Sequence, residues 1–254
     1  MKALLDGDIL VYRVGFGSNE ESEGIARARM DESIEKILDA VKATKYEVFL
    51  TSSDKSNFRI PIFPEYKANR KAPKPVHYDA LREYLVTEHQ ANMVHGQEAD
   101  DAMGIEQTNE IEALMHQDYG AFPEGNDLNT IICSIDKDMD QIPGWHFNFV
   151  KGIKYFVTPF EGLYKFYLQL LMGDATDNIK GIPGIGPKKA TGMLELAKTE
   201  EDMYSAVETA YKAAFPENYM DLIRCYGQLL KIRTKEDELW LPLPERQNPS
   251  SALG

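Results

Sequence analysis

The residues NTIICSIDKD, at positions 129–138, contain the clearest strand signal in the chain. The run over 129–135 is short and strongly apolar, which predicts a buried strand. Two carboxylates, Asp136 and Asp138, follow where that strand is expected to end. In an open parallel sheet, ligands bind beyond the carboxyl ends of the strands. The stretch therefore predicts a strand that delivers two acidic side chains to a functional edge.

Acidic residues follow three other predicted strands in the same way, at 3–5, 46–53 and 91–96. Helical spacing at 24–43, 75–89 and 98–117 separates these strands. The alternation predicts an α/β fold with a central, mostly parallel sheet flanked by helices. The carboxylates that follow the three strands are Asp6, then Asp54, then Glu98, Asp100 and Asp101.

The second part of the chain has a different pattern. From residue 160 the spacing predicts helix almost to Arg233, with breaks at 181–186 and 215–218. Asp174 and Asp177 lie three residues apart where this part begins, so they can share a helix face. We expect an α/β core over 1–158, a helical part over 159–244 and a loose tail over 245–254.

Carboxylates gathered at one edge need cations, because like charges in one pocket repel each other. Hard oxygen ligands select Mg²⁺ or Mn²⁺, and two such ions about 3.5–4 Å apart hydrolyse phosphodiesters. Taken singly, each acidic group is better explained by helix capping or by the helix dipole than by metal binding. The nine predicted ligands are Asp6, Asp54, Glu98, Asp100, Asp101, Asp136, Asp138, Asp174 and Asp177.

Composition narrows the function classes. A formal net charge of −13 over 254 residues argues against a generic nucleic-acid binder, which should be basic. Without the nine predicted ligands, 32 acidic residues remain against 28 basic ones, so a nucleic-acid substrate is compatible with the rest of the surface. No apolar run reaches the ~18 residues of a membrane span, so no membrane partner is expected. Two cysteines indicate a reducing compartment, and we expect a cytoplasmic protein.

The segment FRIPIFPEYKANRKAPKP, at 58–75, is basic and aromatic. Spacing of i, i+3, i+4 and i+7 puts four of its cations on a single helical face until Pro73 intervenes. Tyr66 and Phe58 offer faces for stacking on a base. A solvated loop is the alternative, but the position between two carboxylate clusters favours contact with DNA. The cations on that face are Lys67, Arg70, Lys71 and Lys74, and Arg59 lies upstream.

The segment GIPGIGPKKA, at 181–190, joins two glycine turns to a helix start and presents backbone N–H groups to an anion. Lys188 and Lys189 are unfavourable in a first helical turn unless a phosphate binds there. The pattern predicts a DNA-backbone clamp of the helix-hairpin-helix kind, over about 174–198, that reads no sequence. An ordinary Gly/Pro turn is the alternative.

Together these segments resemble the 5′-nucleases: flap endonucleases, the 5′-nuclease domain of bacterial DNA polymerase I, and phage 5′–3′ exonucleases. The appearance is nearest to the exonucleases of T-odd phages. The resemblance covers residues 4 to about 190, roughly three quarters of the chain. The matching pieces are LLDGD, TSSDKSNFR, PEYKANRK, EADD, SIDKDMD and LLMGDATDNIKGIPGIGPKKA.

The resemblance implies a PIN-like core, a short basic arch over about 66–90 and a helix–three-turn–helix clamp. It implies that the nine carboxylates hold two Mg²⁺ or Mn²⁺ ions. Lys67 and Arg70 correspond to the basic pair that contacts the scissile phosphate. The turn at 181–186, with Gly184 and Gly186, corresponds to a K⁺ site beside DNA-contacting Lys188 and Lys189.

The expected function is metal-dependent 5′–3′ exonucleolytic hydrolysis of DNA, with RNA primers in RNA–DNA hybrids as a second substrate. The resemblance implies a role in phage replication or DNA degradation. A flap endonuclease that cuts at single-strand/duplex junctions is the alternative within enzymes. A DNA-structure binder without turnover is the alternative outside them, and a small RNase that shares the acidic site is a third.

Overall fold

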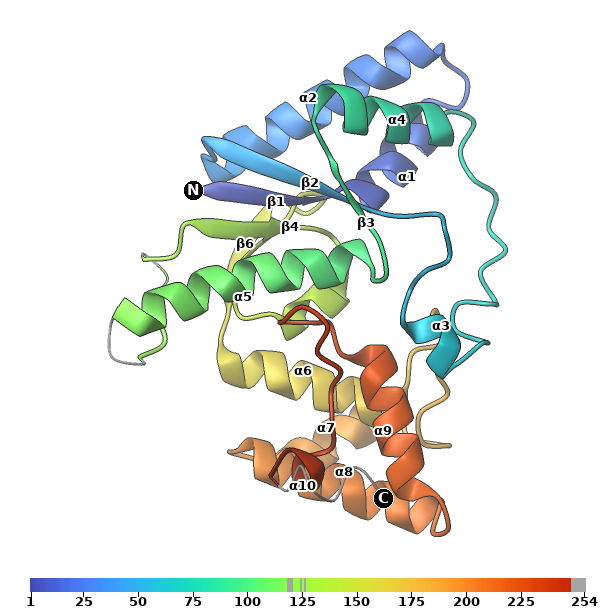
Figure 1. The fold of residues 1–254 in the computed structure, drawn as a ribbon, viewed down its shortest axis with the longest axis vertical. Coiled ribbons are helices and arrows are strands. Elements are labelled where there is room, and N and C mark those ends of the chain that lie inside the picture. The colour runs from blue at the N-terminus through green and yellow to red at the C-terminus, as the bar shows by residue number, and fades with distance from the viewer. Residues whose placement is uncertain (118–120, 124, 126, 248–254) are drawn as a thin grey trace. The chain divides into compact units, whose positions relative to one another are not determined.

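A six-stranded sheet forms the centre of the N-terminal part of the chain in the computed structural model (Figure 1). The structure describes residues 1–117, 121–123, 125 and 127–247. Contacts within the chain define two units. Unit 1 contains Met1–Asn57, Ala72–Val157 and Ile232–Glu236, and unit 2 contains Phe58–Lys71, Thr158–Lys231 and the residues from Asp237 onward. The sequence-based boundary after residue 158 differs from these units at 58–71 and at 232–236.

The sheet has the strand order β3-β2-β1-β4-β5-β6. Five strands are parallel, and β6 is antiparallel to β5, which confirms the predicted mostly parallel sheet. The chain leaves β1 for β2 on one side and later places β4 on the other, so the strand order reverses between β1 and β4. The strands are β1 (Lys2–Asp6), β2 (Lys45–Thr51), β3 (Asn92–Val94), β4 (Thr130–Cys133), β5 (Gly144–Asn148) and β6 (Ile153–Val157).

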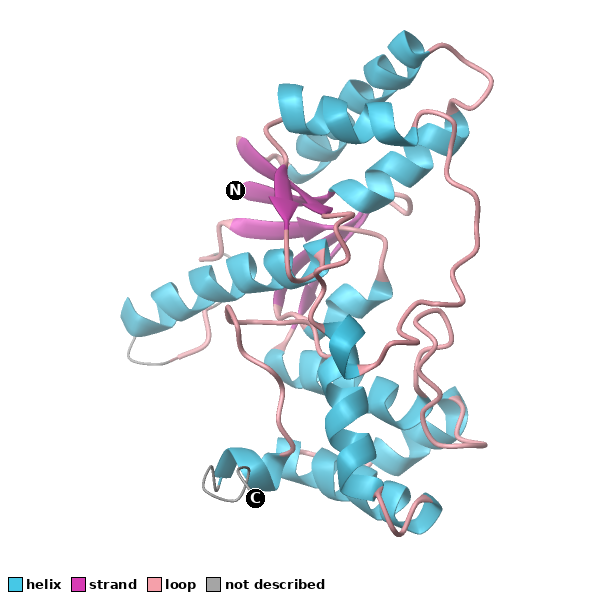
Figure 2. Ribbon diagram, turned by 45° about the vertical axis from the view of Figure 1, so that its right-hand side comes forward, coloured by secondary structure: helices cyan, strands magenta, loops and turns pink. Residues whose placement is uncertain are grey.

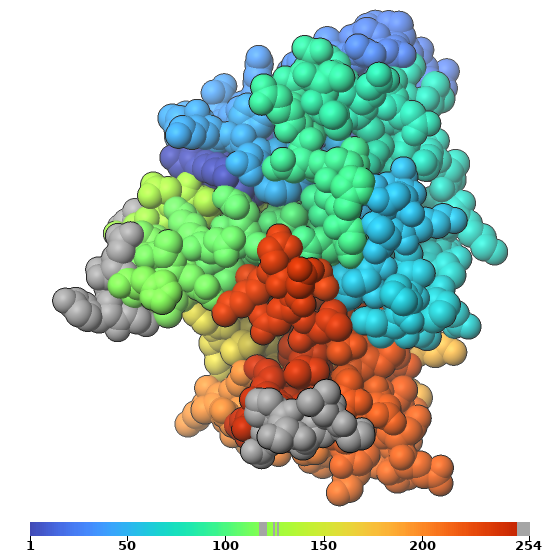
Figure 3. All heavy atoms as spheres, in the orientation of Figure 1, coloured from blue at the N-terminus to red at the C-terminus, as the bar shows by residue number. Residues whose placement is uncertain are grey.

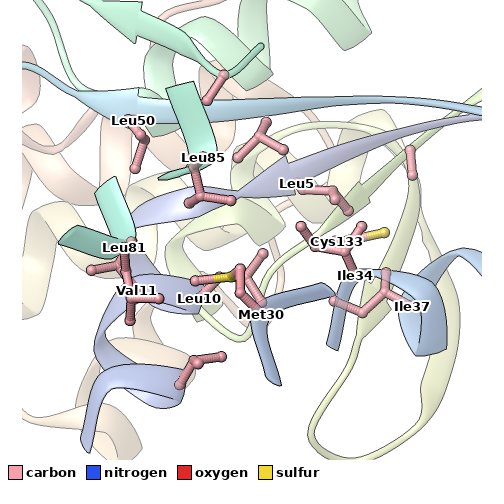
Figure 4. Close-up of a cluster of buried hydrophobic side chains, with 14 of the residues drawn as sticks. Leu5, Leu10, Val11, Met30, Ile34, Ile37, Leu50, Leu81, Leu85 and Cys133 are labelled. Carbon is pink, nitrogen blue, oxygen red and sulfur yellow. The ribbon is translucent and has the colours of Figure 1, made fainter. Parts of the chain in front are cut away.

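Helices cover both faces of the sheet (Figure 1). One face carries α1 (Gly7–Gly17), α2 (Glu23–Val41) and α4 (Tyr78–Glu88), and the other carries α5 (Ala99–Gln117). Side chains of β1 alternate between the two faces, so Leu5 packs in the cluster of Figure 4 and Leu4 packs in the cluster beside α5. Both clusters consist of buried apolar side chains, and this burial stabilises the strands that carry the candidate ligands at their ends.

Unit 2 is built of helices, shown in cyan in Figure 2. Its core consists of buried aromatic and aliphatic side chains from α6, α7, α8 and α9, and Phe166, Tyr167 and Tyr211 are fully buried there. The predicted helical C-terminal part is therefore present. The helices are α3 (Arg59–Ile62), α6 (Pro159–Met172), α7 (Pro187–Leu194), α8 (Glu200–Ala214), α9 (Tyr219–Leu230) and α10 (Leu243–Gln247).

The predicted tail begins inside a helix. Residues 245–247 belong to α10, and the buried Glu245 pairs with Arg224 of α9 at 2.6 Å. Residues 248–254 lie outside the described residues. Among the residues that are described, no helix is both long and apolar enough to cross a membrane.

Candidate active site

Asp6 ends β1 at the point where the strand order reverses. It caps α1 by accepting a hydrogen bond from Ile9 N at 3.0 Å, and it accepts a second from Ser134 Oγ at 2.7 Å. Burial raises the pKa of Asp6 to about 7, and the charges of Asp8 and Asp136 add to the effect of burial against these hydrogen bonds. A buried carboxylate with carboxylate neighbours is a group that a bound cation would stabilise.

Ser134, just after β4, joins the two sides of the reversal. Its hydroxyl donates to Asp6 and accepts from Asp136 N at 3.0 Å. Asp136 in turn caps the short 3₁₀ helix η1 (Lys137–Gln141) by accepting from Asp138 N at 2.8 Å. The structure therefore brings together Asp6 and the Asp136–Asp138 segment, which the sequence analysis grouped from strand ends alone.

Asp54, in the loop after β2, is exposed and lies on a network of its own. It accepts from Ser56 N at 2.9 Å and lies 2.6 Å from His95 Nδ1. Hydrogen bonds from Ser56 and His95 hold the pKa of Asp54 well below its usual range. The carboxylate is thus ionised and accessible, as a ligand for a cation must be.

The acidic residues at the start of α5 also have a structural role. Asp101 is fully buried and accepts from Glu98 N at 3.0 Å and from Arg233 N at 2.9 Å. It therefore ties the returning segment Ile232–Glu236 to α5, whose green surface lies against the red of that part of the chain in Figure 3. Glu98 and Asp100 are half-buried beside it. Nothing in the sequence pattern predicted this tie.

These unit 1 side chains offer only hard oxygen donors, which fit Mg²⁺ or Mn²⁺ better than softer metals. Within the part of the chain that the structure describes, no three His, Cys, Asp or Glu side chains are spaced to hold a metal ion. Several carboxylates are instead satisfied by protein donors, as described for Asp54 and Asp101. The assignment of all nine as metal ligands stays a prediction.

Asp177 pairs with two of the predicted basic residues in unit 2. Arg70 Nη2 lies 2.6 Å from Asp177 Oδ1, and Lys67 Nζ lies 3.6 Å from Oδ2. Tyr66 Oη donates to Oδ2 at 3.1 Å, and the backbone N–H of Lys67 donates to the carbonyl of Asp177. Asp174 accepts from the N–H groups of Thr176 and Asp177 and so shapes the turn that presents Asp177. Unit 2 thus joins two predicted ligands to the two predicted phosphate contacts.

The expected helical face over 67–74 is wrong. Turns and extended backbone occupy this segment, because Lys67 has a φ of +56° and Pro73 and Pro75 remove backbone donors. Lys71 and Lys74 are exposed, and Lys74 Nζ lies 4.0 Å from the centroid of the Tyr78 ring.

Two of the predicted DNA contacts are buried in unit 2. The Arg59 side chain donates to Leu229 O at 2.8 Å and to Lys231 O at 2.9 Å, which satisfies carbonyls at the C-terminal end of α9. Tyr66 is buried in the apolar core, so its face cannot stack on a base in this structure. Both are corrections to the predicted DNA-contacting set: their partners are protein groups.

The segment between α6 and α7 contains two glycines with left-handed backbone. Gly181 has a φ of +59°, and a Cβ there would lie 2.2 Å from Met172 C, so only glycine fits. Gly184 also has positive φ, and Gly186 caps α7 without a side-chain bond. Lys188 is exposed, and Lys189 Nζ donates to Gly184 O at 2.9 Å. The DNA and K⁺ roles of this turn stay predictions.

Sequence reasoning missed an exposed aromatic group of unit 1. The ring of Tyr12 lies 6.0 Å from that of Phe16, one turn later on α1, and 5.4 Å from that of Tyr78. Tyr12 and Phe16 are 37% and 47% exposed, and Lys74 adds a cation to the group. The i, i+4 spacing of the two α1 aromatics was the available signal, but α1 itself was not predicted.

The comparisons with known proteins assign the family. A family model described as "5′-3′ exonuclease, N-terminal resolvase-like domain" matches residues 1–161. The chain belongs to the 5′–3′ exonuclease family. This confirms the resemblance inferred from the carboxylate segments, and it agrees with the mostly parallel sheet and its helical layers.

Curated relatives of the family include a 5′-3′ exonuclease of Buchnera aphidicola from Schizaphis graminum, 29% identical over 230 residues that cover 84% of this chain and 76% of the relative. The flap endonuclease Xni of Shewanella pealeana is 25% identical over 252 residues, 91% of each chain. The solved T5 5′-exonuclease aligns with a TM-score of 0.57 at 20% identity, covering 90% of this chain and 84% of that one.

Proposed function

We propose that this chain is a divalent-metal-dependent 5′–3′ exonuclease that hydrolyses DNA phosphodiesters from a 5′ end. Family membership supports nuclease chemistry. The observation that carries the metal-dependent step is Asp6, buried where the strand order reverses and linked through Ser134 to Asp136. A buried carboxylate with acidic neighbours, and with the raised pKa described above, is suited to a divalent cation.

The proposed division of labour follows from the donor set. The carboxylates of unit 1 would hold one Mg²⁺ or Mn²⁺, and Asp174 and Asp177 of unit 2 would hold a second. Bound divalent ions supply an activated water and neutralise charge on the phosphate. Lys67 and Arg70 would bind the scissile phosphate and stabilise charge that develops on its oxygens.

The substrate contacts are proposed from exposed cations and aromatics. Lys188 and Lys189 would contact the duplex backbone beside the turn at 181–186, with K⁺ on its carbonyl groups. Tyr12, Phe16 and Tyr78, with Lys74, are suited to stacking and charge contact with a single strand. Lys71 of unit 2 is proposed as a separate charge contact with DNA. These contacts read no base edges, so we expect activity on many sequences, including RNA primers in RNA–DNA hybrids.

Flap endonuclease action is the second candidate, because a relative matched over 91% of both chains carries that name. The two activities differ in product length. An exonuclease releases mononucleotides, whereas a flap endonuclease releases the intact arm. Relatives named DNA polymerase I support a role in replication or repair, and primer removal is the proposed step. A role in phage replication or DNA degradation remains part of the proposal.

The test uses a duplex with a 5′ single-stranded arm, labelled at its 5′ end, with Mg²⁺ or with EDTA. Mononucleotides that form only with Mg²⁺ support the exonuclease, and release of the whole arm supports the flap endonuclease. A matched RNA–DNA hybrid tests primer removal. Asp6→Asn should abolish cleavage, whereas Asp39→Asn, an exposed aspartate of α2, should not. Tight DNA binding without cleavage would overturn the proposal in favour of a binding protein.

A further inference from the structure

Arg82 is a buried arginine of α4 that lies at the junction of several elements of unit 1. Its Nη1 lies 2.6 Å from Asp8 Oδ1, and its Nη2 donates to Thr51 O at 2.5 Å. The Arg82 side chain is only 10% exposed. The contacts therefore link α4 to the first turn of α1 and to the last residue of β2.

Asp8 is fully engaged by this arrangement. Its second oxygen, Oδ2, accepts from Thr51 N at 2.9 Å. Thr51 Oγ1 accepts from Ala99 N at 3.0 Å, so the same network reaches the first residue of α5. Each connected element end lies beside a predicted metal ligand: Asp6 precedes Asp8 by two residues, Asp54 follows Thr51 by three, and Glu98 and Asp100 flank Ala99.

We propose that Arg82 is a positioning residue that keeps the Asp8 carboxylate out of the metal-ligand set. The inference rests on the proposed function. Asp8 lies in the helical turn that Asp6 caps, so without Arg82 its Oδ1 would have no cationic partner beside the predicted ligands, while Oδ2 would still accept from Thr51 N. An additional hard oxygen ligand there would attract the divalent ion and draw it away from its working position.

A purely structural ion pair makes different predictions. Removing one partner of a buried pair destabilises the fold because the other charge loses its compensation. Such a loss would leave metal affinity unchanged or weaken it. If Arg82 instead keeps Asp8 away from the metal, loss of Arg82 should give tighter metal binding and slower turnover. Neutralising Asp8 should then reverse both effects.

The test is a double-mutant cycle with Arg82→Met, Asp8→Asn and the combined variant. Mn²⁺ binding to the metal-free proteins is measured by calorimetry, and kcat and KM are measured with Mg²⁺ on the labelled substrate. Arg82→Met should bind Mn²⁺ roughly threefold to tenfold more tightly, because a nearby carboxylate is no longer neutralised. Its kcat should fall roughly tenfold to a hundredfold with little change in KM, as for other residues that orient metal ligands.

The combined variant and Asp8→Asn should both have an Mn²⁺ affinity and a kcat within about threefold of wild type. A remaining difference of this size is expected from altered positioning alone. Arg82→Lys keeps the charge and should behave like wild type in Mn²⁺ affinity even where Arg82→Met folds poorly. Arg13→Met, at an exposed arginine of α1, is the matched control. Thermal unfolding in EDTA reports folding of every variant.

Unchanged or weaker Mn²⁺ binding in Arg82→Met would overturn the inference, as would a combined variant as slow as Arg82→Met. Failure of the proposed function is a separate outcome, because it would appear as wild-type protein that binds Mn²⁺ without cleaving DNA. The calorimetric cycle still tests the role of Arg82 in that case.

Discussion

Arg70 and Asp177, 107 residues apart in sequence, form an ion pair of 2.6 Å in unit 2. Lys67 lies 3.6 Å from the same carboxylate, and Tyr66 donates to it. A predicted metal ligand is therefore paired with both predicted phosphate contacts in this structure. A cation bound at Asp177 would compete with Lys67 and Arg70 for the negative charge of this carboxylate.

Replacement of that charge is the first prediction. Asp177→Asn should lower single-turnover cleavage at least about 100-fold, because a ligand and its charge are lost. DNA binding without metal, measured by fluorescence anisotropy, should persist or strengthen, because the ion pair between Arg70 and Asp177 is lost. Asp221→Asn, at an exposed aspartate of α9, is the control. Near wild-type turnover would remove Asp177 from the site.

The exposed lysines at the start of α7 are predicted to bind the DNA backbone. Lys188→Ala combined with Lys189→Ala should weaken duplex binding to a similar degree for all sequences. The dependence of log K on log[salt] should flatten by about one to two, since each lost phosphate contact contributes a slope of about 0.9. Titrations at several salt concentrations measure this, and an effect confined to particular sequences would contradict a backbone clamp.

Arg59 is predicted to act in the fold of unit 2 and not on DNA. Arg59→Ala removes charged hydrogen bonds to Leu229 O and Lys231 O and should lower the free energy of unfolding by about 3 kcal/mol. Chemical denaturation measures the loss. DNA affinity, measured where the variant is folded, should match wild type. A stable variant with weakened DNA binding would restore the contact expected from sequence.

Lys231 gives a prediction for pH. Burial lowers the pKa of Lys231 from its ordinary 10.5 to about 8, and its ammonium lies 5.3 Å from the centroid of the Phe166 ring. Between these two pH values the unfolded chain holds more protons than the folded chain, so this group makes stability rise with pH. Lys231→Met should flatten that rise in denaturation curves, while Lys198→Met, at an exposed lysine, should not. An unchanged slope would contradict the lowered pKa.

The sheet could be predicted because the sequence signal for each strand is local to that strand. Alternating apolar runs and the acidic residue at the end of each run were enough to place Asp6, Asp136 and Asp138 at strand ends. The cap that Asp6 forms on α1 was also among the alternatives, and the structure shows that the same carboxylate caps the helix and lies beside Asp136 in the candidate site.

The basic segment could not be interpreted in this way, because its partners are remote in sequence. Arg59 bonds to a carbonyl 170 residues away, and Tyr66 bonds to a carboxylate 111 residues away. The spacing of Lys67 and Arg70 predicted that they are neighbours on a helix. The positive φ of Lys67 and the two prolines that follow instead give turns and irregular backbone. The sequence shows which cationic side chains are present, but tertiary packing determines which of them are exposed to solvent.

The return of residues Ile232–Glu236 to unit 1 has a consequence for biosynthesis. The buried carboxylate of Asp101 can accept from Arg233 N only after residue 233 has left the ribosome, 132 residues after Asp101. Unit 1 therefore cannot finish folding before residues 158–231 of unit 2 have been translated, although most of its own residues emerge first. Until then the apolar cluster beside α5 lacks Ile232, and the Asp101 carboxylate lacks the N–H of Arg233.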